Sequence, residues 1–228
     1  MYFCASDSIY TKASMKTFVL SFFSIFFILR VSGQNIKFKT FTAEDGLSNN
    51  SINQIMNDPS GGIWVGTWDG LNFYDGHSFK VYKHDPQDSS SLRGNFISEI
   101  LLDKTGKVWV KSNSTSISQF VDGYGFINFP FDKPIGRMGV TPDKHLLVQV
   151  EGEKFLYEGE RFASCSACGF YAEIKPDFEK IITKHYPDLI IKDQYRDHKG
   201  NLWFATITTG LYILPYATEQ VKKENEYL

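Results

Sequence analysis

Short runs of hydrophobic residues alternate with turn-forming residues along most of the chain. Runs of four to six residues rich in Ile, Val, Phe, Tyr and Trp are separated by Gly, Asp and Asn, a pattern typical of short β-strands joined by tight turns. In the clearest region the pattern predicts four strands, at about 52–57, 62–67, 71–75 and 78–82. The Asp58–Gly62 stretch suits the first turn, because proline fixes φ and glycine allows positive φ. The fold class is therefore predicted to be all-β.

This strand pattern repeats. Residues 47–67 return 45 residues later as residues 92–112, with eight identical positions. The identical pairs are Leu47/Leu92, Asn50/Asn95, Ile52/Ile97, Ile55/Ile100, Asp58/Asp103, Gly61/Gly106, Trp64/Trp109 and Val65/Val110. The Asp, Gly and Trp frame recurs at Asp197, Gly200 and Trp203. Repeats of roughly 40 to 50 residues indicate the blades of a β-propeller.

One repeat unit has lost part of its motif. Tyr157-Glu158-Gly159 repeats Tyr74-Asp75-Gly76, but the segment ahead of it, PDKHLLVQV, has no Trp. We take Asp143 as the counterpart of Asp58. The four-stranded blades are then predicted near 47–82, 92–129, 135–163 and 189–214. A single sheet cannot bury both of its faces, so stacked blades cover one another. We therefore assign Trp64, Trp109 and Trp203 to packing between blades rather than to ligand stacking.

Two segments fall outside these four units. Ile36–Phe41 resembles an outer strand with no blade in front of it, and the last unit lacks its own fourth strand after Leu211–Leu214. The N-terminal strand could complete that last blade or await a later one, and we expect the second, truncated arrangement. In residues 177–185 the apolar positions have helical spacing, which predicts a short helix lying on the propeller.

The N-terminal region has the pattern of an export signal. Met15 and Lys16 precede a 12-residue apolar run, Phe18–Leu29, and small residues follow up to Gly33. Such a run is too short to cross a bilayer as a helix and is typical of a secretory signal peptide. We expect residues 1–33 to be an upstream extension and signal peptide, cleavage after Gly33, and a periplasmic protein. An uncleaved membrane anchor is the alternative. Residues 217–228 are expected to be a polar tail.

Charge and motif content argue against several function classes. The chain has 24 Lys and Arg against 26 Asp and Glu without a long run of like charge, so nucleic acid is not an expected partner. The five histidines share no repeated spacing, and no triad, acid pair, metal motif or cofactor motif is visible. We therefore expect no catalytic residues, no metal and no cofactor.

Two cysteines, Cys165 and Cys168, remain after the upstream Cys4. In an oxidising compartment they could close a small local disulfide that removes little loop entropy. The alternatives are a metal site with His185 or a redox pair. A structural or incidental pair is the interpretation we favour.

The first repeat resembles a known family. DPSGGIWVGTWDGLNFYDGHSF, with FTAEDGLSNNSINQI ahead of it, is similar to the two-component regulator propeller repeat of Bacteroidetes-type hybrid sensor kinases, and the likeness covers about residues 34–216. The resemblance implies a periplasmic sensor region that in longer relatives precedes a membrane helix and a histidine kinase, many of which respond to glycan breakdown products. Because this sequence has no kinase motif and few blades, the resemblance implies a fragment, a split gene product, or a propeller that works with a sensor-kinase or other propeller-containing chain.

Loops at one end of the predicted strands form the candidate binding site. Polar groups with one exposed aromatic ring suit a sugar, and an arginine suits an acidic group on it. The candidate ligand-binding residues are Trp68, Asp69, Asn49, Arg93 and Asn113. Alternatively Trp68 packs on the rim, and Asn50 and Asn95 cap turns. The expected function is ligand sensing, with an oligosaccharide as the expected ligand; the alternatives are an interaction module without a small-molecule ligand, or a propeller lyase.

Overall fold

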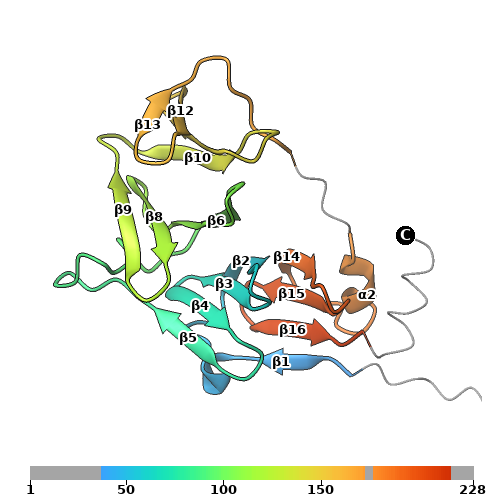
Figure 1. Ribbon diagram of the computed structural model, residues 1–228. Helices are drawn as coiled ribbons and strands as arrows, with labels where there is room; N and C mark the ends of the chain where they lie inside the picture. Colours follow the sequence, from blue (N-terminus) through green and yellow to red (C-terminus); the bar gives the residue numbers. More distant parts are fainter. Residues whose placement is uncertain (1–36, 173–176, 217–228) are drawn as a thin grey trace, which may run out of the picture. The chain divides into compact units, whose positions relative to one another are not determined.

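The computed structural model describes residues 37–172 and 177–216, and this part of the chain consists almost entirely of four antiparallel sheets with four strands each (Figure 1). The predicted signal peptide and polar tail lie outside the described residues. The predicted all-β class and the division into propeller blades are confirmed by these sheets. Within the described ranges no helix is long and apolar enough to span a membrane.

Blades 1 to 3 follow one another along the chain, and each is a meander in which sequential strands pair. Blade 1 comprises β2 (Ile52–Asn57), β3 (Ile63–Thr67), β4 (Gly70–Tyr74) and β5 (Phe79–Tyr82). Blade 2 comprises β6 (Glu99–Leu102), β7 (Val108–Lys111), β8 (Ser116–Val121) and β9 (Gly125–Pro130). Blade 3 comprises β10 (Ile135–Val140), β11 (Leu146–Val150), β12 (Glu153–Tyr157) and β13 (Phe162–Ser164). The four strands predicted for blade 1 lie within one residue of those observed.

Blade 4 joins the two ends of the described chain. It contains β14 (Ile191–Arg196), β15 (Leu202–Thr206), β16 (Leu211–Leu214) and, as its fourth strand, β1 (Lys39–Phe41). In the antiparallel pairing of β1 with β16, Phe41 lies opposite Leu211, and both side chains are buried. The expectation that the N-terminal strand awaits a later blade is therefore wrong. Burial of Phe41 against Tyr74 and Phe79 of blade 1, with ring centroids 5.1 and 5.3 Å away, stabilises this pairing.

Hydrophobic side chains pack between three pairs of neighbouring blades. One cluster joins blades 4 and 1, a second joins blades 1 and 2, and a third joins blades 2 and 3. Each cluster contains one of the three repeated tryptophans: Trp203, Trp64 and Trp109 respectively. All three are at most 5% exposed. The predicted packing role of these tryptophans is confirmed, and among the described residues no fourth cluster of this kind joins blades 3 and 4.

The Asp-Gly-Trp motif is a hydrogen-bonded clamp. In each copy one carboxylate oxygen of the aspartate accepts a hydrogen bond from the indole N–H, at 2.6 Å for Asp58–Trp64, 2.9 Å for Asp103–Trp109 and 2.8 Å for Asp197–Trp203. The other oxygen accepts from the backbone N–H two residues after the aspartate and so holds the turn. The motif therefore fixes the β-turn and satisfies a polar group that the buried indole carries into the core.

Blade 3 builds the same turn from different residues. Thr141 N donates to His145 O and Lys144 N donates to Thr141 O, as Asp58 N and Gly61 N do with Gly62 O and Asp58 O in blade 1. Thr141 is thus the structural counterpart of the motif aspartate, and Lys144 takes the positive-φ position of the glycine, with φ of 58°. The assignment of Asp143 as that counterpart is wrong, because hydrogen bonding rather than residue type sets the equivalence.

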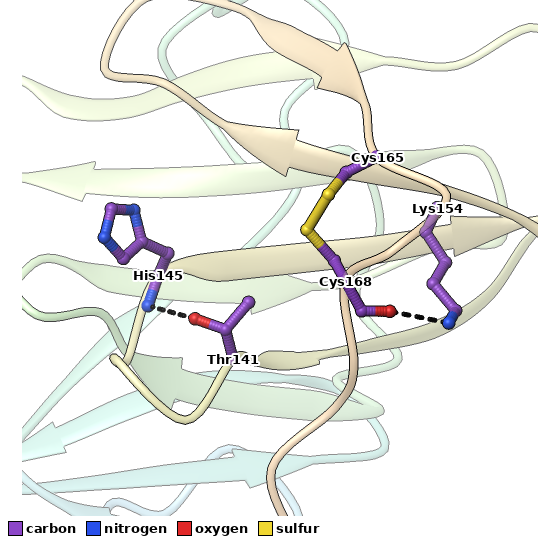
Figure 2. The surroundings of a disulfide bond; sticks show 5 residues. All are labelled: Thr141, His145, Lys154, Cys165 and Cys168. Atoms are coloured by element: carbon purple, nitrogen blue, oxygen red, sulfur yellow. Dashed lines mark hydrogen bonds between the residues drawn. A yellow bond between two sulfur atoms is a disulfide. The ribbon is translucent and has the colours of Figure 1, made fainter.

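The segment between blades 3 and 4 contains a short helix and the disulfide. Helix α2 (Glu179–Thr183) lies beside the sheet of blade 4 (Figure 1), with Phe178, Ile181 and Ile182 buried. The predicted short helix is confirmed. Cys165 and Cys168 form a disulfide, and Lys154 Nζ donates to the carbonyl of Cys168 at 2.6 Å (Figure 2). The small local disulfide that the sequence allowed is therefore present.

Candidate functional site

The five candidate residues lie at one end of the strands, the end where first strands begin and second strands finish. We call this the loop edge; it comprises residues 47–51, 67–70, 83–98 and 112–115. Backbone hydrogen bonds join its loops: Trp68 N donates to Ser51 O at 3.0 Å, and Gly70 N donates to Asn95 O at 2.7 Å. The loops of blades 1 and 2 therefore form one connected surface.

Trp68 is an exposed ring held in a fixed orientation. It lies in the turn after β3 and is 53% exposed. Its indole N–H donates to Asn53 Oδ1 at 3.1 Å, and Asn53 Nδ2 in turn donates to the carbonyl of Ile97 in blade 2 at 2.8 Å. Because the polar edge of the ring is anchored, its apolar face is available to a ligand without the cost of ordering a free side chain.

Phe96 extends this aromatic surface, and sequence reasoning missed it. It is 49% exposed, and its ring centroid lies 6.0 Å from that of Trp68 at an interplanar angle of 57°. The repeat alignment contained a signal: Phe96 follows Asn95, whereas the equivalent residue after Asn50 is Ser51. A phenylalanine that replaces a serine on a loop edge is a candidate contact residue. Trp68 and Phe96 together form what we call the aromatic pair.

Charged groups also lie on the loop edge. Asp69 accepts a hydrogen bond from Lys83 Nζ at 2.6 Å, and both side chains are 44% exposed. This exposed ion pair contributes little to stability but places hydroxyl-binding groups next to Trp68. Arg93 is exposed in the loop between β5 and β6, where its carbonyl accepts from Asn113 Nδ2 at 3.1 Å.

The asparagines of the loop edge have local structural roles. Asn49 Oδ1 accepts from Ser51 N at 2.7 Å, and Asn113 Oδ1 accepts from Thr115 N at 3.0 Å. Both are hydrogen bonds to the backbone two residues ahead, the pattern of an Asx-turn. Asn50 and Asn95 hold longer loops, because their side-chain oxygens accept from Ala43 N and His84 N, each at 2.7 Å. Asn50 and Asn95 thus hold backbone, as the capping alternative expected, but the N–H groups that they accept from lie 7 and 11 residues away and not in the turn that enters the strand.

Two depressions lie at the opposite end of the strands, each between neighbouring blades. One, of about 390 Å³, is formed by the Asp103 turn of blade 2 and by residues of blade 3 that include His145 and Tyr157. Lys104 Nζ lies 2.8 Å from His145 Nε2 at its rim. The other, of about 300 Å³, is formed by the Asp197 turn of blade 4 and by Tyr74 and its neighbours in blade 1. Both repeat the same relation of a motif turn to the following blade.

Against the effect of burial, the hydrogen bonds of the clamp lower the pKa of Asp103, which lines the first depression. Burial acts to raise the pKa of its carboxyl group, but hydrogen bonds from the Thr105 hydroxyl, the Trp109 indole and the backbone N–H groups of Thr105 and Lys107 lower the pKa overall. The ionised aspartate is therefore the form that the folded turn stabilises. No cluster of three or more His, Cys, Asp or Glu residues in the described ranges could hold a metal ion.

Comparison with known families agrees with this geometry. The model of the two component regulator propeller matches residues 46–69, the segment that contains β2, β3, the Asp58–Trp64 clamp and Trp68. The resemblance to two-component regulator propeller repeat proteins is thereby confirmed for blade 1. The chain is a protein of β-propeller blades that carries a two-component regulator propeller repeat.

Individual proteins are similar to this chain over parts of their length. Histidine kinase P4 of Formosa agariphila is 50% identical over 64 residues, which are 28% of this chain and 5% of the kinase. The extracellular domain of a putative hybrid two component system from B. thetaiotaomicron is 21% identical with a TM-score of 0.46, and the match covers 81% of this chain and 24% of that one. A virginiamycin B lyase from Staphylococcus aureus is 10% identical with a TM-score of 0.42, over 80% of this chain and 60% of the lyase. This chain spans only a small part of the kinase.

Proposed function

We propose that this chain is an exported, non-catalytic sensing module of a two-component system that binds an oligosaccharide at the loop edge. The two-component regulator propeller repeat in blade 1 and the 50% identity to part of a histidine kinase support the signalling context. The predicted signal sequence supports export. A sensor-kinase chain, or another chain that contains a propeller, is the partner through which binding would be transmitted.

The observation that carries the proposal is the aromatic pair. Two half-exposed rings from adjacent blades, one of them anchored by Asn53, offer an apolar platform beside the Asp69–Lys83 pair, and Arg93 is exposed on the same loop edge. A sugar ring has apolar C–H faces and a polar rim, so it matches an aromatic platform flanked by hydrogen-bonding groups. Arg93 adds selectivity for sugars that carry a carboxylate or sulfate.

Isothermal titration of the purified chain with neutral and acidic oligosaccharides tests the proposal. We expect one oligosaccharide class to bind, Trp68→Ala and Phe96→Ala each to weaken binding at least tenfold, which corresponds to about 1.4 kcal/mol, and Arg93→Ala to weaken acidic sugars selectively. Tyr124→Ala is the matched control, since Tyr124 is 60% exposed at the opposite end of the blade 2 strands. Binding that Tyr124→Ala abolishes as completely as Trp68→Ala would contradict the assignment of the site. A failure of every oligosaccharide to bind would favour an interaction module that binds only protein.

A further inference from the structure

A hydrogen bond is repeated between the first strands of successive blades. Asp193 of blade 4 accepts from Ile55 N of blade 1 at 3.0 Å, and Gln54 of blade 1 accepts from Ile100 N of blade 2 at 2.7 Å. Glu99 of blade 2 likewise accepts from Met138 N of blade 3 at 3.1 Å. Blades 4, 1 and 2 thus each offer a side-chain acceptor to the backbone of the next blade. The series has a direction, from blade 4 through blades 1 and 2 to blade 3.

Blade 3 breaks the series at its own acceptor position. Arg137 pairs with Gln149 just after a register shift in β10, as Gln54 pairs with Gly66 just after a register shift in β2. An arginine has only donors and cannot accept this hydrogen bond. Its guanidinium instead lies 4.2 Å from the ring centroid of Phe170, which belongs to the connecting segment that follows blade 3.

The connecting segment fits closely against this first strand. Tyr171 N donates to the carbonyl of Val140 at the end of β10, at 2.7 Å. Gly139 makes room for Phe170, since a Cβ atom at that position would lie 2.7 Å from the ring. The disulfide closes the turn that leads into this contact, and Lys154 holds the Cys168 carbonyl (Figure 2). The outer side of blade 3 is therefore occupied by the chain's own connecting segment.

The same segment also occupies the outer side of blade 4. Gln194 holds the position that Ile55, Ile100 and Met138 hold in the other blades, but its backbone N–H donates to Asp193 of its own strand at 3.0 Å. Its side-chain oxygen accepts from Phe178 N at 2.9 Å, and its amide nitrogen donates to Asp177 Oδ1 at 3.2 Å.

Helix α2 completes this second contact. Arg196 lies 4.7 Å from the ring centroid of Phe178, an arginine-over-phenylalanine contact like that of Arg137 and Phe170 in blade 3. Ile181 and Ile182 are buried, and Tyr186 packs on Tyr212 of β16 with centroids 5.4 Å apart. The two parts of the segment, residues 165–171 and 177–186, thus cover the first strands of the two blades at the ends of the series.

We propose that residues 165–171 and 177–186 form a two-part cap that prevents these end blades from pairing with the blades of a second copy of this chain. Repeat arrays need caps because an uncovered terminal unit exposes a face built to contact the next one. The covered face of blade 3 corresponds to the face that blades 4, 1 and 2 each pack against the next blade. The covered face of blade 4 corresponds to the face that blades 1, 2 and 3 each pack against the preceding blade. Without the cap, blade 3 of one copy would fit blade 4 of another, and two copies would supply eight blades, a number found in closed propellers.

The association state of the purified chain tests the cap. Light scattering during size-exclusion chromatography should give the mass of one copy for the unaltered chain at all concentrations. The double variant Phe170→Ala/Phe178→Ala should shift with rising concentration to the mass of two copies, whereas Phe96→Ala/Tyr124→Ala, which removes two exposed rings outside the cap, should remain at one copy. A folded cap variant that stays at one copy would overturn the proposal, and so would a two-copy mass for the unaltered chain.

Arg137→Gln/Arg196→Gln decides the question if the double phenylalanine variant does not fold. It removes the arginine contacts with Phe170 and Phe178, one in each part of the cap, and restores at position 137 the acceptor that Gln54 supplies in blade 1. Circular dichroism should match that of the unaltered chain, and the two-copy particle should appear with rising concentration. A one-copy mass for this variant at every concentration would overturn the proposal.

Discussion

Blades 2 and 3 are neighbours with the same four-stranded meander, yet only blade 2 keeps the Asp–Trp clamp. In blade 2, Asp103 holds the turn and the Trp109 indole together; in blade 3, Thr141 holds a similar turn through His145 N at 3.1 Å, and the position of the tryptophan is taken by buried Leu147. Both sheets nevertheless form. The buried hydrophobic residues of the strands therefore suffice for the meander, and the clamp adds stability to it.

The largest expected difference between blades 2 and 3 is in the free energy of unfolding that is lost when the residue at the tryptophan position is replaced by alanine. Trp109→Ala should lower the free energy of unfolding by about 3–5 kcal/mol, because it leaves a cavity between blades 2 and 3. Leu147→Ala should cost less, about 2–3 kcal/mol, within the usual range for a buried leucine. Urea unfolding followed by circular dichroism measures both. A larger loss for Leu147→Ala would show that the tryptophan is not the main anchor.

Replacing the turn residues Asp103 and Thr141 should give a smaller difference in unfolding free energy between the two blades. Asp103→Ala deletes an ionised acceptor and leaves the buried indole N–H without its partner, which should cost roughly 2–3 kcal/mol. Thr141→Ala removes a single neutral acceptor and should cost about 0.5–1.5 kcal/mol. Equal losses in the same urea experiment would contradict the clamp as a source of added stability.

Acid should remove the stability that ionised Asp103 contributes through the clamp. The folded pKa of Asp103 is lower than its value in the unfolded chain, normally about 3.9. Its contribution is therefore fully present above that value and is lost as the pH falls through the folded pKa. Thermal unfolding between pH 7 and pH 3 should show a shallower loss of Tm for Asp103→Asn than for the unaltered chain. Parallel curves would indicate that Asp103 does not contribute to acid sensitivity.

The smallest expected effect concerns the positive-φ position of the turn. Lys144→Gly should stabilise the chain by roughly 0.5–1 kcal/mol, because relief of left-handed strain exceeds the added entropy of the unfolded state. Gly106→Ala at the equivalent position of blade 2, where φ is 78°, should destabilise by roughly 1 kcal/mol. Chemical unfolding of this pair checks the sign, and a loss for Lys144→Gly would contradict the equivalence.

Sequence alone was sufficient to predict the blades, because the spacing of Asp, Gly and Trp records the clamp and the turn directly. It failed in blade 3, since the turn there depends on backbone hydrogen bonds that Thr141 and Lys144 make as well as Asp and Gly. The predicted position of the N-terminal strand was also wrong. Its pairing with a strand from the other end of the chain depends on an apolar surface that buries Phe41, and the local sequence pattern contains no information about such a surface.

The candidate site was predicted in part. Trp68 is exposed as expected, but Asn49 and Asn113 are engaged in local turns, and Phe96 was missed. Loop residues of these types serve either folding or binding, and only the hydrogen-bond partners separate the two roles. The contact of Arg137 with Phe170 was also beyond sequence reasoning, since it joins a strand to a segment that matches no repeat.

Differential scanning calorimetry of the purified chain tests whether the loop edge of this propeller binds an oligosaccharide through the aromatic pair. We expect a cooperative unfolding transition whose midpoint rises with the concentration of one class of oligosaccharide, as mass action requires for a ligand of the folded state. The rise should vanish in Trp68→Ala and persist in Tyr124→Ala. No shift with any oligosaccharide, or an equal shift in Trp68→Ala, would contradict this expectation.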